Sequence, residues 1–294
     1  MNIQRDDFVL EIGSGDNPSP FSHVLVDKFF EPTHHRKNTP MKLDERPLII
    51  GDAERLPFKD QSFDYVICSH VIEHIPGVEA AFGELMRVAK AGYIETPSIY
   101  AERIVGKHDI HLWHIYSNGR KLFLNRKTPE NISSFVNPEV FDLMFADFFW
   151  SVPNLFLVRY EWTSKIEYAI LSDQEMAIKY RDYDKLIDRP VRGADEFDPR
   201  RLRFGAFLLK RELVNLARGI APSLIQSYYL RKKKRVRDRW RRTTVFDQQS
   251  LREKFDSALC CPHCHGALKK GERGYTCDAC DHIFESEHGI PKFL

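Results

Sequence analysis

The stretch LEIGSGDNPSPFSHVLVDKF, residues 10–29, contains two short apolar runs joined by a turn with two glycines. Gly13 and Gly15 follow the first run, and Asp27 ends the second. Short apolar runs bounded by turn residues are typical of strands buried on both faces of a sheet. Parallel strands usually need a dozen or more connecting residues, but this connection is shorter and contains prolines, which disfavour a helix. We therefore expect two parallel strands with a trimmed first crossover.

The same pattern continues along the first part of the chain. Further short apolar runs lie at residues 47–50, 63–68 and 92–94. Between the last two, the stretch VEAAFGELMRVAKA at residues 78–91 places apolar side chains on one helical face. A helix between two buried strands is a βαβ crossover, so the sequence predicts an α/β fold with a Rossmann-like, doubly wound, mostly parallel sheet. Residues 155–160 and 166–171 resemble an antiparallel pair that closes the sheet.

Composition divides the chain into three predicted parts. The chain has 294 residues, a net charge of +2 and no apolar run of membrane-spanning length. We expect a sheet domain over residues 1–172, a charged and largely helical extension over 173–256, and a small cysteine-rich unit over 257–294. The first residues lack the basic-then-apolar layout of a signal peptide, which predicts a cytoplasmic protein. The sequence indicates no oligomeric state.

The predicted strand ends carry the groups of a nucleoside-binding site. In doubly wound sheets, ligands bind outside the carboxyl ends of the strands. Gly13 and Gly15 allow a ligand close to the backbone, and Asp27 can accept hydrogen bonds from ribose hydroxyls. Asp52, after the third run, can accept one from the amine of adenine. Because Pro18 stands where G-x-G-x-x-G would have its third glycine, a nucleoside without phosphates fits better than a dinucleotide.

These strand ends belong to a longer series of motifs. LEIGSGDNP, VLVDKF, GDAERLPFKDQSFDYVICSHVIEHI and GYIETPS, in this order, resemble the successive motifs of class I S-adenosylmethionine-dependent methyltransferases over residues 8–100. The resemblance implies that S-adenosylmethionine is the cofactor. By position it implies these contacts: Glu11, Gly13 and Gly15 at the methionine side, Asp27 at the ribose, Asp52 and Ala53 at the adenine, and Ser69 and His70 beside the sulfonium and the acceptor.

A histidine-rich stretch offers candidate bases for methyl transfer. GKHDIHLWHIYSN follows the fifth apolar run and contains His108, His111 and His114. Imidazoles can act as general bases near neutral pH, and loops at this position of the fold face the active site. His70 is the other candidate. The three loop histidines could instead only pack at the surface or hold a metal, and Glu73 and His74 are interpreted as the start of a helix.

The end of the chain predicts a metal site. Two Cys-x-x-Cys motifs lie close together there, formed by Cys261, Cys264, Cys277 and Cys280. Four thiolates in a tetrahedral array suit a structural zinc ion and leave no open position for catalysis. Cys260, His263 and His265 are alternative ligands that do not keep the paired spacing. The ending GYTCDACDHIF…GIPKFL resembles the zinc ribbons of small activator subunits that partner some methyltransferases, which implies docking or stabilisation.

A basic segment precedes this unit. Residues 228–242, YYLRKKKRVRDRWRR, contain nine Lys or Arg residues with interleaved aromatic and aliphatic side chains. Such a segment can bind RNA phosphates, lie on an anionic membrane, or form a solvated helix face.

Together these features predict an S-adenosylmethionine-dependent methyltransferase with a C-terminal zinc ribbon. We expect an O-methyl acceptor, a saccharide or another small or lipid-linked molecule, and a location in the cytoplasm or at the inner face of the membrane. One alternative is an RNA methyltransferase that grips RNA with the ribbon and the basic segment. The other is a non-catalytic module that kept the fold, against which the intact glycine turn and the two strand-end aspartates argue.

Overall fold

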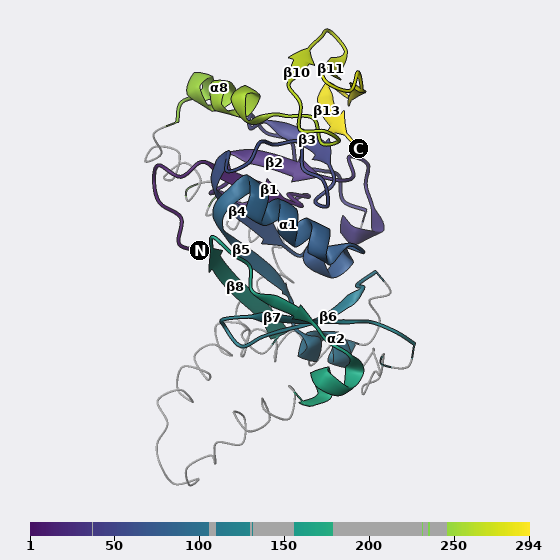
Figure 1. Ribbon diagram of the computed structural model, residues 1–294. Helices are drawn as coiled ribbons and strands as arrows, with labels where there is room; N and C mark the ends of the chain where they lie inside the picture. The colour runs from purple at the N-terminus through teal and green to yellow at the C-terminus, as the bar shows by residue number, and fades with distance from the viewer. Residues whose placement is uncertain are drawn as a thin grey trace, which may run out of the picture.

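A ten-stranded sheet forms the centre of the protein (Figure 1), in a computed structural model that describes residues 1–36, 38–105, 110–129, 131, 156–178, 231, 235 and 246–294. Its parallel centre consists of β1 (Val9–Ile12), β2 (Val24–Asp27), β3 (Leu48–Gly51), β4 (Phe63–Ser69) and β5 (Ala89–Pro97). These strands lie in the order β3-β2-β1-β4-β5, which reverses between β1 and β4. That order is the doubly wound one, so the predicted Rossmann-like fold is confirmed.

The first crossover is trimmed, as the sequence predicted. No helix forms between β1 and β2, where all residues are described. Instead, the backbone N–H of Gly13 donates to the carbonyl of Val26 at 2.8 Å, so the turn lies against the end of β2. The short 3-10 helix η1 (His34–Arg36) follows in the connection from β2 to β3.

Helix α1 (Val78–Val88) supplies the regular crossover between β4 and β5, and it buries an apolar face that includes Phe82 and Leu85. It is three residues shorter than the predicted helix. Ala89 already has an extended backbone, with φ −134° and ψ 152°, and it pairs with Phe63 of β4. Pairing with β4 therefore overrides the helical pattern of residues 89–91 and lengthens β5 at its start.

The predicted pairing of residues 155–160 with 166–171 is wrong, because the two segments join different sheets. Strand β8 (Leu157–Thr163) runs antiparallel to β5 over seven residue pairs. Ser164 then adopts a left-handed backbone with φ 63°, and the chain leaves the large sheet. Strand β9 (Tyr168–Ile170) pairs in parallel with β7 (Leu122–Arg126), which itself pairs with β6 (Trp113–Ser117). Helix α2 (Ile99–Val105) connects β5 to this smaller sheet.

The C-terminal unit extends the large sheet. Helix α8 (Gln248–Ala258) precedes a ribbon of β10 (Leu268–Lys270), β11 (Gly274–Cys277), β12 (Ile283–Glu287) and β13 (Ile290–Phe293). Strand β13 pairs in parallel with β3, and Phe293 lies opposite Gly51. Figure 1 shows these ribbon strands, in yellow-green and yellow, above β3. The ribbon thus covers an edge that β3 would otherwise present to solvent.

Two sets of predictions lie largely outside the described residues. Of the basic segment 228–242, only Arg231 and Arg235 are described, and most of the predicted extension 173–256 is outside as well. The three domain boundaries therefore stay predictions. Within the described residues, no helix has the length and apolar character needed to cross a membrane.

Candidate functional site

A cavity of about 1160 Å³ lies at the carboxyl ends of β1 to β4. The residues that the resemblance assigned to the cofactor and acceptor all line it: Glu11, Gly13, Gly15, Asp27, Asp52, Ala53, Ser69 and His70. Residues from four separate strand ends therefore meet in one space, as expected where the strand order of a doubly wound sheet reverses.

The glycine turn after β1 needs its glycines. Gly13 and Gly15 have φ values of 73° and 51°, in the left-handed region that side chains with a Cβ rarely adopt. A Cβ on Gly13 would also lie 2.2 Å from Cγ2 of Val71, which follows β4. The backbone N–H of Gly15 donates to Oδ2 of Asp27 at 2.9 Å. The turn is thus held between the ends of β2 and β4.

Glu11 supports the segment that replaces the missing crossover helix. Its side chain is buried, and its carboxylate accepts hydrogen bonds from the N–H of Ser19 at 2.8 Å and the hydroxyl of Ser22 at 2.6 Å. Arg46 donates to the same Ser22 hydroxyl at 2.7 Å and to the Ser19 carbonyl at 2.7 Å. Glu11 therefore positions the loop beside the cavity through its carboxylate.

Each of the two strand-end aspartates faces a basic side chain. Oδ1 of Asp27 lies 3.4 Å from the guanidinium of Arg36, and Oδ2 of Asp52 lies 2.6 Å from the ammonium of Lys28. Arg36 also donates to the carbonyls of Phe29 and Phe30, so it fixes the loop after β2 at the mouth of the cavity. Sequence reasoning missed both cations, since nothing in the pattern around them indicates that they turn toward the acids.

His70 lies at the cavity in a strained backbone conformation, with φ 56°. Its Nδ1 is 3.4 Å from Oε1 of Glu73, and its Nε2 is 3.8 Å from Oε1 of Glu95. Burial opposes a charge on the ring, but the interactions with Glu73 and then Glu95 raise the pKa of His70. The two carboxylates hold the ring beside the cavity, where His70 can position a bound acceptor or exchange a proton with it.

The loop histidines occupy different places. His111 lines the cavity, and its Nδ1 hydrogen-bonds Oε1 of Glu102 at 2.5 Å. His114 is buried in β6 and is absent from the described lining of the cavity. His108 lies outside the described residues. The structure thus brings His111 and His70 to one space.

Glu73 and His74 are further residues of the cavity lining that sequence reasoning did not assign to the site. The sequence predicted that they start a helix. They lie instead in η2 (Ile72–His74), a three-residue 3-10 turn that ends before α1 begins at Val78. The signal that could have found them is the SHVIEHI block itself, in which they lie four and five residues after the end of β4. Glu73 is 1% exposed; burial alone would raise the pKa of Glu73, but His70, His74 and His111 together lower it.

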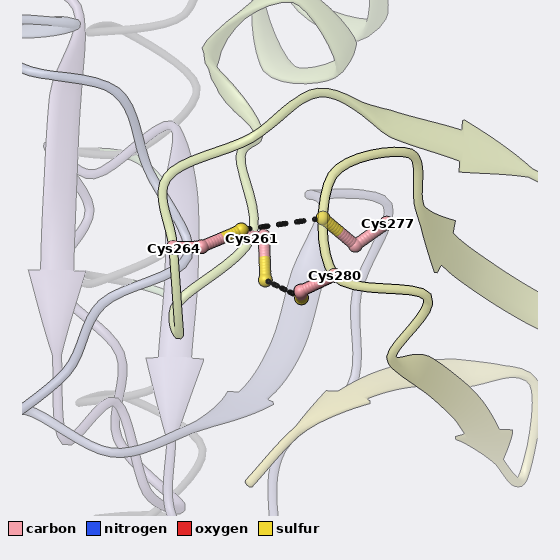
Figure 2. A group of neighbouring side chains, drawn as sticks. All are labelled: Cys261, Cys264, Cys277 and Cys280. Atoms are coloured by element: carbon pink, nitrogen blue, oxygen red, sulfur yellow. Dashed lines mark hydrogen bonds between the residues drawn. The ribbon is translucent and has the colours of Figure 1, made fainter.

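The four cysteines of the C-terminal motifs converge on one point (Figure 2). The Sγ atoms of Cys261 and Cys280 are 3.7 Å apart, and those of Cys264 and Cys277 are 3.4 Å apart. These separations exceed the ~2.05 Å of a disulfide. They agree with the ~3.8 Å edge of a tetrahedron whose centre lies ~2.3 Å from each sulfur, the usual zinc–sulfur distance. The cluster is compatible with a small zinc-binding module.

The alternative ligands lie outside this four-sulfur group. The Nδ1 of His263 contacts the guanidinium of Arg55 at 3.1 Å, and its ring stacks on Phe284. Cys260 is buried, and burial raises the pKa of its thiol to about 11. Its backbone N–H donates to the carbonyl of Pro57, which helps to dock the ribbon on the loop after β3.

Comparison with known proteins supports a methyltransferase domain. Residues 30–94 match the family described as "Methyltransferase domain". The sterol 24-C-methyltransferase of Schizosaccharomyces pombe is 39% identical over 51 residues, which cover 17% of this chain and 14% of that protein. The ubiquinone/menaquinone biosynthesis C-methyltransferase of Xanthomonas oryzae is 35% identical over 92 residues, which cover 28% of this chain and 36% of that protein.

A solved structure also matches part of this chain. A SAM-dependent methyltransferase from Methanosarcina mazei has a TM-score of 0.27 and 16% identity, over 49% of this chain and 80% of that one. The chain spans less than half the length of the two curated relatives. The family match includes β3, β4, α1 and most of β5, and hence Asp52, Ser69 and His70; it does not extend to the cysteine cluster.

Proposed function

We propose that this chain is an S-adenosylmethionine-dependent methyltransferase. The observation that carries the proposal is the convergence of the glycine turn, Asp27 and Asp52 on one cavity at the reversal point of the sheet. The matched methyltransferase segment contains Asp52, strand β4 and His70, which follows that strand. The residues fit the cofactor chemically, because two carboxylates at adjacent strand ends can accept hydrogen bonds from ribose and adenine.

The cofactor would supply an activated methyl group, and the contribution of the chain is to bind and align the reactants. Gly13 and Gly15 would give the amino-acid part of the cofactor access to the backbone. Asp27 would hold the ribose in competition with Arg36, and Asp52 would hold the adenine amine in competition with Lys28. These ion pairs orient the two carboxylates before the cofactor arrives.

Calorimetric titration with S-adenosylmethionine tests this proposal. We expect a single binding event, weakened at least tenfold in Asp27→Ala because two ribose hydrogen bonds are lost, each to a charged acceptor worth about 1.5–3 kcal/mol. Glu285→Gln, on the exposed ribbon strand β12, is the control and should bind as the unmodified protein does. Absence of binding, or unchanged affinity in Asp27→Ala, would refute the proposed function and revive the non-catalytic alternative.

We propose a small-molecule acceptor. The relatives that support this are named as methyltransferases of a sterol and of ubiquinone or menaquinone biosynthesis, and both names specify transfer to carbon. The O-methylated saccharide or lipid-linked acceptor expected from the sequence stays a prediction, as do RNA or membrane contact through residues 228–242 and the cytoplasmic or membrane-peripheral location. No described residue favours one of these over another.

We also propose that Cys261, Cys264, Cys277 and Cys280 bind one structural zinc ion. The sulfur separations support this proposal, and so does the small size of the ribbon, which could not fold on its apolar core alone. Gly266 supports it as well, because a Cβ there would lie 3.2 Å from the sulfurs of Cys264 and Cys277.

A further inference from the structure

One wall of the cavity carries a cluster of three metal-ligating side chains. Glu73, His74 and His111 each place one ligand atom within 4.8 Å of the other two. Glu73 and His74 come from η2, directly after β4, and His111 precedes β6. The backbone N–H of Leu112 donates to the carbonyl of Glu73 at 2.6 Å, and the indole N–H of Trp113 donates to the carbonyl of Ile75 at 2.7 Å. The fold therefore fixes the two segments against each other.

Both imidazoles are oriented through Nδ1. The Nδ1 of His74 is 3.0 Å from the carbonyl oxygen of Ile110, which can only accept, so this nitrogen carries the proton. The Nδ1 of His111 is 2.5 Å from a carboxylate oxygen of Glu102, and the other carboxylate oxygen of Glu102 binds the ammonium of Lys127. A neutral imidazole that donates from Nδ1 has a lone pair on Nε2, and metal-bound histidines are held by such donation to a carbonyl or a carboxylate.

The third member is a buried carboxylate. The side chain of Glu73 is 1% exposed, and neither of its oxygens accepts a hydrogen bond from any described residue. The Nδ1 of His70 lies 3.4 Å from Oε1 of Glu73, but the side chain of His70 is itself half exposed. A buried carboxylate without hydrogen bonds is costly, and a bound cation removes that cost.

We propose that Glu73, His74 and His111 bind one divalent first-row metal ion at the wall of the cavity. Two imidazoles and one carboxylate form a ligand set known to hold such ions while leaving coordination positions open. This set differs from the four thiolates of the ribbon, which leave none. If the proposed function is correct, an open position would bind an oxygen atom of the acceptor; that role rests on the proposed function, whereas binding of the ion does not.

Titration with Mn²⁺, followed by electron paramagnetic resonance, tests the site. The protein is prepared with one zinc ion per chain, so that the ribbon thiolates are occupied; thiolates are also poor ligands for Mn²⁺. We expect one bound Mn²⁺ per chain, with affinity reduced at least tenfold in Glu73→Gln and in His111→Gln. Both substitutions keep the approximate size of the side chain, and His111→Gln serves if Glu73→Gln does not fold.

A matched control comes from a second cluster of similar composition. Glu31, Glu287 and His288 also place ligand atoms within 4.8 Å of one another, but Glu31 and His288 are exposed and Glu287 is only partly buried. His288→Ala should leave Mn²⁺ binding unchanged. No bound Mn²⁺, equal binding in Glu73→Gln and His111→Gln, or loss of binding in His288→Ala would each overturn the inference. Because Mn²⁺ binding is measured without S-adenosylmethionine, failure here is distinguishable from failure of the proposed methyl transfer.

Discussion

Replacement of Gly13 by alanine tests how closely the turn after β1 approaches the segment after β4. The added Cβ would lie 2.2 Å from Cγ2 of Val71, and φ at this position is 73°. The left-handed backbone costs a non-glycine residue about 1–2 kcal/mol. Relief of the overlap forces Val71 to shift, at about 1–3 kcal/mol. We therefore expect Gly13→Ala to lower the free energy of unfolding by about 2–5 kcal/mol.

A double substitution separates the two contributions. Val71→Ala removes Cγ2, and the nearest atom left on residue 71 is Cβ, 3.6 Å from the added methyl group, an ordinary contact. Gly13→Ala in the Val71→Ala background should then cost only the backbone strain, so the two changes should show a favourable coupling of about 1–3 kcal/mol. Equilibrium unfolding in urea of the four proteins measures this coupling.

Gly15→Ala is the matched control. Its φ of 51° imposes similar backbone strain, but the nearest foreign atom is Cδ of Arg36 at 3.3 Å, in a flexible side chain. We expect a loss of about 1–2 kcal/mol and no coupling to Val71→Ala. Equal losses at Gly13 and Gly15, or strictly additive effects of Gly13→Ala and Val71→Ala, would refute the inferred contact between the two strand ends.

Four further predictions concern the ion pairs and the ribbon. Lys28→Met should raise the affinity for S-adenosylmethionine by up to about fivefold, because an exposed ion pair worth at most about 1 kcal/mol no longer competes for Asp52. Calorimetry measures this affinity, and weaker binding would contradict the competition between Lys28 and the cofactor. Burial raises the pKa of Asp64, but the ion pair with Lys90 and the hydrogen bond from the N–H of Phe8 outweigh burial and lower it from 3.8. The charged carboxylate therefore stabilises the fold fully above pH 3.8, and this stabilisation is lost as the pH falls through the lowered pKa. Asp64→Asn should therefore flatten the decline of the unfolding free energy in acid, and an unchanged slope would show that this ion pair is not responsible. Cys264→Ser should abolish stoichiometric zinc, measured by mass spectrometry of the metal, whereas Cys260→Ser should retain one ion per chain; the reverse result would reassign the ligands. Phe293 is 1% exposed and packs on Phe284, so Phe293→Ala should cost about 3–5 kcal/mol of ribbon stability in hydrogen exchange, and unchanged protection of β13 would contradict its docking on β3.

The parallel centre of the sheet could be predicted from sequence because its signals are local. Each of the first three strands is a short apolar run in which nearly every residue is buried, and the prolines between β1 and β2 exclude a helix on their own. The strand-end residues could be grouped for the same reason: once strands are parallel, Asp27 and Asp52 must lie at one edge. In this part of the chain, the local sequence pattern is sufficient to predict which residues lie together.

The remaining features depend on partners that are distant in sequence. Strand β8 alternates in burial over residues 157–163 as a strand with one covered face does, but this pattern does not say whether β5 or a following strand lies beside it. The positions of the histidines likewise cannot be predicted from the local sequence. His74 and His111 are far apart in the chain, and their ring centroids lie 4.6 Å apart only because the start of β6 packs against η2. His114, three residues later, turns into the core, and no local signal distinguishes the two.

The ribbon and the cofactor end of β3 are coupled by the pairing of β13. Strand β3 would be the edge of the parallel sheet without it, with unpaired backbone groups next to Asp52. The ribbon, in turn, is too small to fold on its own apolar core and depends on its cysteine cluster. If the proposed zinc ion binds there, its removal should release β13, expose the edge of β3 and loosen the strand end that carries Asp52. The C-terminal unit would then act on the candidate site through the backbone of the sheet, since no cysteine is among the described residues that line the cavity.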